Sequence, residues 1–187
     1  MSTHPAKAFE EAHERHEHGR EGPSWVPLAA AVLAVLAAVS GYFGNLRSTQ
    51  ALVEKNDAIV ATTHASDTWA QYQAERIKFY IAQTALDGGV GPGANAGRLK
   101  SNAAEEKAKA PPLMKKARAF EEESVHHNER SEQLLKQHET IEVGTTLFEV
   151  AIVLVSITVL VGSRLLPFVG GAAALIGVLF FALGLTR

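Results

Sequence analysis

Glu149 is the residue whose type and position most directly suggest chemistry, because it is an acid inside an otherwise apolar run. A carboxylate within a membrane is energetically costly and is by default a functional candidate. Arg47 follows the first apolar run. We therefore expect it at the membrane surface where the run that contains Glu149 enters the bilayer. We hypothesise an ion pair between Arg47 and Glu149 that joins two helices. The alternative is that Glu149 handles protons or cations in an oligomer.

The N-terminal tail, residues 1–24, holds a second group of potential ligands. They are His13, His16 and His18. Closely spaced imidazoles can bind zinc and related metals. The zinc-protease spacing His-Glu-x-x-His is absent because Glu17 stands in the place of the second histidine. We therefore interpret the tail as disordered, with these histidines as weak metal candidates, and expect no metal or other cofactor.

Other common catalytic patterns are missing. The chain has no cysteine, which excludes disulfides, thiolate metal sites and a cysteine nucleophile. The glycine-rich stretch from Gly88 to Gly97 is not followed by the Gly-Lys-Ser/Thr of a phosphate-binding loop. Three further histidines are interpreted as surface or seam residues of a helical hairpin: His126, His127 and His138. A net charge of −2 gives no support to nucleic-acid binding. We predict that the protein is not an enzyme.

Three apolar runs, at 25–44, 144–162 and 165–185, supply the elements that position these residues. Each contains about 20 residues, enough for an α-helix to cross a hydrocarbon core of about 30 Å. Gly162-Ser163-Arg164 alone separates the second run from the third, so a tight antiparallel pair of spans is expected. These runs predict a multi-pass protein of the lipid bilayer.

The first run has a competing interpretation as a cleaved signal peptide, since Ala38-Val-Ser40 loosely fits a cleavage site. The acidic tail before it is a poor n-region, so we predict a retained span. Small residues four apart could let the spans approach one another closely. These pairs are Ala37 with Gly41, Gly170 with Ala174, and Ala173 with Gly177.

The polar segment 45–143 is expected to form a helical hairpin. The breakers at 87–97 predict a loop, and Pro111-Pro112 should kink or restart a helix. Helices are expected over 46–86, 98–109 and 113–143. The first of these helices follows the first apolar run with no proline between them, and the last enters the second run through Gly144, so we expect both to continue into the bilayer.

Heptad spacing indicates an antiparallel coiled-coil-like packing of this hairpin. The predicted seam on the first helix is Leu52, Asn56, Ile59, Thr63, Ser66, Ala70, Gln73, Ile77 and Tyr80. On the second helix it is Leu113, Ala117, Phe120, Ser124, His127, Ser131, Leu134, His138 and Ile141. Both seams are apolar at the ends and polar in the middle, which predicts weak packing. The expected class is therefore all-α, with three transmembrane helices and a long hairpin between the first and second.

The most distinctive stretch is Ala65-Ser-Asp-Thr-Trp-Ala-Gln-Tyr-Gln-Ala-Glu-Arg-Ile-Lys78. Its Trp69, Tyr72 and Arg76, followed by Tyr80, recur at helical spacing and share one face. The functional interpretation is a partner-binding or oligomerisation face, because aromatic residues and arginine often anchor interfaces. The alternative, which we favour, is packing inside the hairpin.

This stretch, with the His/Glu-rich tail, the Ala/Leu-rich first span and the C-terminal pair of spans, resembles a bacterial inner-membrane family of the DUF4337 type. The resemblance covers most of the chain, though not the tip at 87–97. It implies a bacterial inner (cytoplasmic) membrane location, and it supplies neither an activity nor catalytic residues.

The function predicted is therefore a non-enzymatic membrane scaffold or protein-interaction module that self-associates. The expected partners are the lipid bilayer, other copies of the chain and a further membrane protein. The alternative is a subunit of an oligomeric ion channel or transporter with Glu149 near the pathway.

Overall fold

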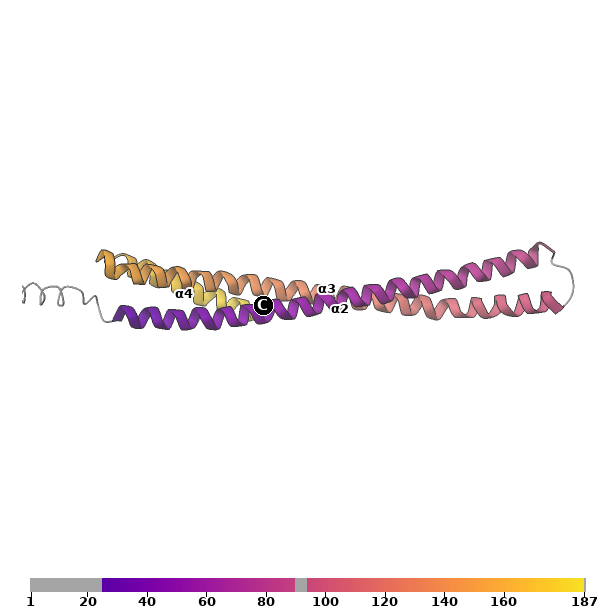
Figure 1. The fold of residues 1–187 in the computed structure, drawn as a ribbon, viewed down its shortest axis with the longest axis horizontal. Helices are drawn as coiled ribbons and strands as arrows, with labels where there is room; N and C mark the ends of the chain where they lie inside the picture. Colours follow the sequence, from indigo (N-terminus) through magenta and orange to yellow (C-terminus); the bar gives the residue numbers. More distant parts are fainter. Residues whose placement is uncertain (1–24, 90–93, 187) are drawn as a thin grey trace, which may run out of the picture. The chain divides into compact units, whose positions relative to one another are not determined.

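The computed structural model describes residues 25–89 and 94–186, which form three α-helices. These are α2 (Trp25–Asp87), α3 (Ala94–Val161) and α4 (Leu166–Thr186). The chain divides into two compact units, and α2 and α3 each contribute to both. The span unit lies within Met1–Arg47 and Lys136–Arg187, and the hairpin unit is Ser48–Leu135. Within each unit α2 and α3 lie side by side (Figure 1). The predicted all-α class is confirmed.

All three helices are long and apolar enough to cross a membrane. Neither α2 nor α3 breaks between its apolar run and its polar part, as the sequence predicts. The α3–α4 connection is as short as expected. Gly162 has a φ of 64° and its N–H bonds to the Thr158 carbonyl at 2.9 Å, a left-handed glycine at a helix end. Pro167 then falls in the first turn of α4, where its missing N–H costs little.

The hairpin tip is tighter than predicted. α2 continues to Asp87, Gly89 has a φ of 77°, and α3 already begins at Ala94, so the expected loop over 87–97 is too long. The early start adds Ala94 and Ala96 to the helix, and alanine is the strongest helix former.

The predicted restart at Pro111-Pro112 is wrong, because both prolines lie inside α3. Each proline removes a backbone hydrogen bond and crowds the preceding turn. The alanines on either side of the prolines are buried at seven-residue spacing, namely Ala103, Ala110 and Ala117. Packing of this one face compensates for the lost hydrogen bonds, so the separate helix expected over 98–109 belongs to α3.

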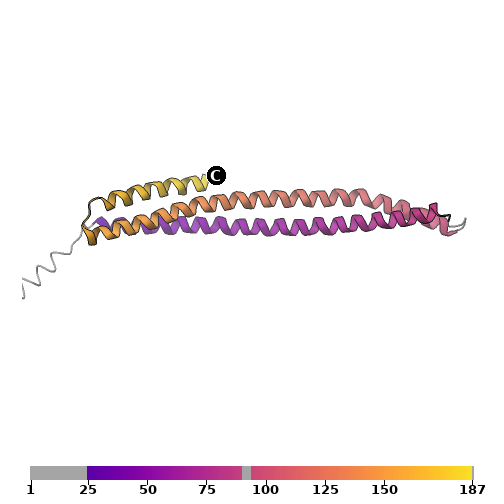
Figure 2. The ribbon, with the colours of Figure 1, turned by 90° about the horizontal axis from the view of Figure 1, so that it is seen from above.

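Glycines let α4 pack directly on α3 in the span unit (Figure 2). Gly170, Gly177 and Gly184 recur every seven residues and are the buried residues of α4. A Cβ on Gly177 would lie 3.0 Å from the Phe148 ring and 3.1 Å from the Gly144 carbonyl oxygen. The backbones of the two helices are therefore in contact. Gly170 and Gly177 each belong to a predicted small-residue pair, and both pack against α3 of the same chain.

Small and polar residues also join α2 to α3 in the span unit. The buried Ser40 hydroxyl lies 2.8 Å from the Thr145 hydroxyl. A Cβ on Gly44 would lie 3.3 Å from the Ile141 side chain. The apolar core consists of Val26, Leu33, Phe148, Ala151 and Val155. These contacts fix an antiparallel register in which Ser40 faces Thr145.

The hairpin unit uses a different seam on α2 from the one predicted. The buried positions are Ala51, Ala58, Ala61, Ala65, Thr68 and Ala82, which we call the inner seam. Every predicted seam position on α2, from Leu52 to Tyr80, is exposed instead. The predicted α3 seam is correct across the hairpin unit, since each of its positions there is buried or half-buried.

Hydrogen bonds explain why alanines form this inner seam. The Ser124 hydroxyl donates to the Ala58 carbonyl at 3.0 Å, and the Ser131 hydroxyl donates to the Ala51 carbonyl at 2.8 Å. A larger side chain at Ala51 or Ala58 would hold the α3 serines away from these carbonyls. Small side chains on α2 thus allow both close approach and satisfied hydroxyls.

The glycine contacts predict that Gly177→Val destabilises the span unit by about 1–3 kcal/mol, because the new side chain would overlap Phe148 and the Gly144 backbone. Gly171→Val on the same helix is the matched control, since a Cβ there meets nothing within 4 Å. Unfolding in mixed micelles with increasing denaturing detergent compares them. Equal stability of the two variants would contradict the packing.

Candidate functional site

The aromatic–arginine cluster, Trp69, Tyr72, Arg76 and Tyr80, lies on α2 in the hairpin unit. The Trp69 and Tyr72 rings meet edge to face with centroids 5.4 Å apart. Arg76 donates hydrogen bonds to the hydroxyls of Tyr72, at 3.0 Å, and of Tyr80. Its guanidinium carbon also lies 5.8 Å from the Tyr72 ring centroid and 5.0 Å from that of Tyr80. The predicted shared face therefore exists as a contiguous set of contacts.

This cluster combines packing with exposure. Trp69 reaches across to α3, where its Nε1 donates to the Glu121 carboxylate at 2.8 Å. Tyr80 is 51% exposed. The hydrogen bonds to Tyr80 and then to Tyr72 raise the pKa of Arg76, so the guanidinium is charged at any physiological pH. The Trp69 bond to Glu121 lies within the hairpin, whereas both packing and partner binding as the role of the cluster stay predictions.

A hollow of about 520 Å³ adjoins the exposed end of the cluster. From α2 it is lined by Tyr72, Arg76, Phe79 and Tyr80, and from α3 by Lys107, Ala110, Pro111 and Met114. Arg76 and Lys107 border the apolar floor of this hollow. The hollow would therefore fit a partner segment that carries an apolar side chain next to an acidic one. Sequence reasoning missed the α3 half, because the cross-helix register that brings Lys107 and Met114 to Arg76 cannot be read from one helix.

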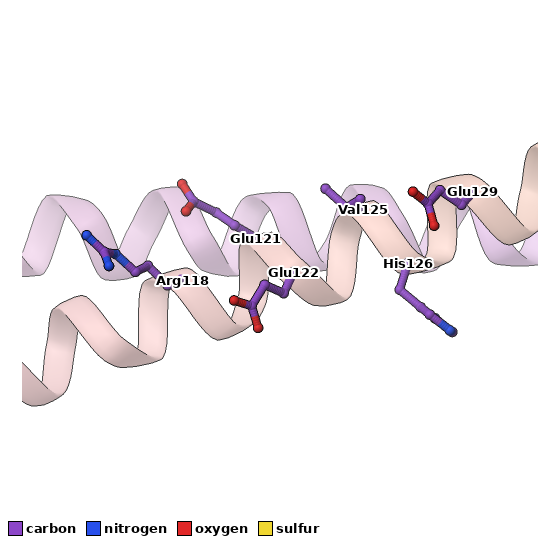
Figure 3. A pocket seen from close by; sticks show the side chains of 6 residues that line it. All are labelled: Arg118, Glu121, Glu122, Val125, His126 and Glu129. Carbon is purple, nitrogen blue, oxygen red and sulfur yellow. The ribbon is translucent and has the colours of Figure 1, made fainter.

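A second hollow of about 480 Å³ is lined by α3 alone: Arg118, Glu121, Glu122, Val125, His126 and Glu129. Figure 3 shows these side chains spread along the helix without converging on one point. The lining is a charged surface of a single helix.

Glu149 is exposed on α3, and Arg47 is half-buried on α2. With Ser40 facing Thr145, the antiparallel register puts Glu149 level with Leu36. Arg47 is about eleven residues further along α2, or about 16 Å at helical rise. The predicted Arg47–Glu149 pair stays a prediction, and this register weighs against it.

A polar contact that sequence reasoning missed joins the two helices of the hairpin unit near Ser48 and Leu135, the end opposite its tip. Glu54 on α2 lies 2.7 Å from His127 Nδ1 and 2.9 Å from Arg130 Nε, both on α3. The His127 hydrogen bond, with the charge of Arg130, lowers the pKa of Glu54 despite partial desolvation. The same bond raises the pKa of His127. His127 is a half-buried seam residue, as predicted, but its acidic partners were not foreseen. The tail candidates His13, His16 and His18 lie outside the described residues.

Comparison with known proteins decides the family. The model of DUF4337, a domain of unknown function, matches residues 23–187. The chain belongs to the DUF4337 family. Its matched region contains all three helices and the aromatic–arginine cluster of this DUF4337 chain. No curated protein and no solved structure matches it significantly. The family description names no activity, so a function has to be argued from the residues.

The Trp69–Glu121 bond predicts that Glu121→Ala destabilises the hairpin unit by about 1 kcal/mol, because a cross-helix hydrogen bond is lost. Glu122→Ala is the matched control, an exposed glutamate next in sequence. In a Trp25→Phe background, Trp69 fluorescence during urea unfolding measures both. An unchanged midpoint for Glu121→Ala would show that this bond contributes nothing.

Proposed function

We propose that the protein is a non-enzymatic scaffold of the bacterial inner membrane whose copies associate side by side in the bilayer. The observation that carries this proposal is the exposure of Glu149 on the span unit. Neither α2 nor α4 covers this carboxylate.

The depth of Glu149 makes its exposure costly. Gly177 packs on Phe148 and Gly184 on Ile141, so Glu149 lies level with Ile176, the middle of α4. In a bilayer spanned by α4, whose 21 residues cover about 31 Å, the carboxylate would lie near the midplane. A charged side chain there costs about 2.5–3.5 kcal/mol on insertion scales. Association that covers Glu149 with polar groups would recover part of this cost.

A second copy supplies suitable polar groups. Thr146 and Ser156 are exposed and share the α3 face of Glu149 at helical spacing. No lysine or arginine occurs in 25–44, 144–161 or 166–186, so another copy offers hydroxyls and its own carboxyl rather than a cation. Hydrogen bonds between polar side chains hold membrane helices together in this way. The glycine face of α4 is already occupied inside the chain, so this α3 face replaces it as the proposed contact.

The hairpin unit offers a further contact between copies. The exposed α2 positions Leu52, Asn56, Ile59 and Ile77, with Tyr80, form an outer stripe at heptad spacing. Copies inserted with one membrane orientation present their α2 helices in parallel. An asparagine at the heptad position of Asn56 is known to set register in parallel coiled coils. The hollow beside Arg76 remains open for a different membrane protein.

The alternative function is an oligomeric ion channel or transporter subunit, and the same exposed Glu149 favours it. A ring of copies with these carboxylates facing inward would line a cation pathway. Ion flux in liposomes that contain the purified protein separates the two. The scaffold predicts flux equal to that of empty vesicles, whereas flux that is lost in Glu149→Gln would establish the alternative.

Cysteine crosslinking tests the proposed interface, and the chain has no native cysteine to interfere. Val153→Cys, on the Glu149 face, should form disulfide dimers in membranes. Leu175 is exposed on α4 within about one helical turn of the level of Val153, so Leu175→Cys should form few. Equal crosslinking at both positions would contradict a specific α3 interface.

The polar contact itself is tested by adding Glu149→Leu or Glu149→Gln to Val153→Cys. Leucine removes the hydrogen-bonding group and should weaken association by about 1 kcal/mol, or roughly fivefold in the association constant. Glutamine retains that group and should preserve crosslinking. Undiminished crosslinking with Glu149→Leu would mean that the carboxyl does not hold the copies together.

A further inference from the structure

Three metal-ligand side chains converge near the end of the hairpin unit opposite its tip, close to Ser48 and Leu135. Glu54 and Asp57 lie three residues apart on α2, and His127 faces them from α3. One ligand atom from each residue lies within 4.8 Å of the others. We propose that these residues form a binding site for a divalent transition metal such as Zn²⁺, which would link α2 to α3.

The spacing is close to what zinc requires. Donor atoms in a tetrahedral zinc site, each about 2.1 Å from the metal, are about 3.4 Å apart. The three donor atoms now lie within 4.8 Å of one another. Bringing them to a separation of about 3.4 Å needs side-chain movements of about an ångström, with no change in the helices. Glu54 and His127 are already closer than this, at 2.7 Å, because they share a hydrogen bond. The metal would take the place of the shared proton.

The donor set selects the class of metal. One imidazole nitrogen with two carboxylates suits zinc and its borderline neighbours, whereas Ca²⁺ and Mg²⁺ prefer oxygen ligands throughout. Three protein ligands leave a fourth position for water. The side chains of Glu54 and His127 are 18% and 27% exposed, so a metal would be partly shielded but reachable from solvent.

Arg130 competes with the metal for Glu54. Its Nε lies 2.9 Å from the Glu54 carboxylate, and its side chain is 62% exposed and can swing away. Asp57 is exposed, and its charge acts on His127. Within 25–89 and 94–186, the Asp57 side chain makes no hydrogen bond or ion pair, so its carboxylate can turn to a metal without breaking one.

The location of the site determines how metal binding would affect the stability of the hairpin unit. Around His127 the α3 seam is polar, with Ser124 and Ser131 on either side of it. A metal held by both helices would join them where the α3 seam is polar. Its binding would therefore raise the stability of the hairpin unit.

Zinc titration of the full-length protein in detergent, followed by competition with a chromophoric chelator, tests the proposal. The tail histidines would first be replaced by alanine so that they cannot contribute: His4, His13, His16 and His18. One zinc should bind per chain. His127→Ala should weaken binding by at least roughly tenfold, since even partners outside the ligand shell are worth about that much. His126→Ala, the adjacent exposed histidine, is the matched control and should bind zinc normally.

Two further variants separate a metal site from a purely structural contact. Asp57→Asn should also weaken zinc binding while leaving helicity by circular dichroism intact, because Asp57 is exposed. Arg130→Ala should tighten zinc binding several-fold, because it frees the Glu54 carboxylate. Equal zinc binding in His127→Ala and His126→Ala, or weaker binding in Arg130→Ala, would overturn the proposal.

Discussion

Close approach of helix backbones is the constraint on which both units of this protein depend. In the span unit, Gly177 of α4 meets Gly144 of α3 with no side chain between them. In the hairpin unit, Ala51 and Ala58 bring α2 near enough for serine hydroxyls of α3 to bond its carbonyls. Because small residues fill the α2 side of the hairpin interface, large apolar side chains of α2 such as Leu52 and Ile59 face outward. The inner packing thus determines which surfaces remain for other molecules.

This distribution explains what the sequence could and could not predict. Apolar runs near 20 residues reveal candidate spans without any knowledge of packing, and a glycine between two of them reveals the turn. The α2 seam was placed wrongly because Leu52 and Ile77 carry a stronger hydrophobic signal than the alanines that are actually buried. The helix restart predicted at Pro111 and Pro112 is wrong for a related reason. Burial of the alanine face outweighs the local tendency of the two prolines to end a helix.

Cross-helix contacts were the least predictable part of the candidate site. The shared face of Trp69, Tyr72 and Arg76 follows from spacing within one helix. The pairing of Glu54 with His127 and of Trp69 with Glu121 depends on the register of α2 against α3. A shift of one heptad would give different partners with almost the same apolar pattern. The predicted pair of Arg47 with Glu149 also depends on this register, which the sequence of one helix does not reveal.

Outward-facing groups connect the fold to the proposed scaffold. Glu149 occupies the level of the middle of α4, yet the helices described here leave it exposed, and the outer stripe on α2 is exposed in the same way in the hairpin unit. Both features have a physical explanation if other copies of the chain cover them. The mass of the protein extracted together with its surrounding lipid, without detergent, tests this claim most directly. The account predicts a discrete multiple of the mass of one chain, and a uniform population of single chains would contradict it.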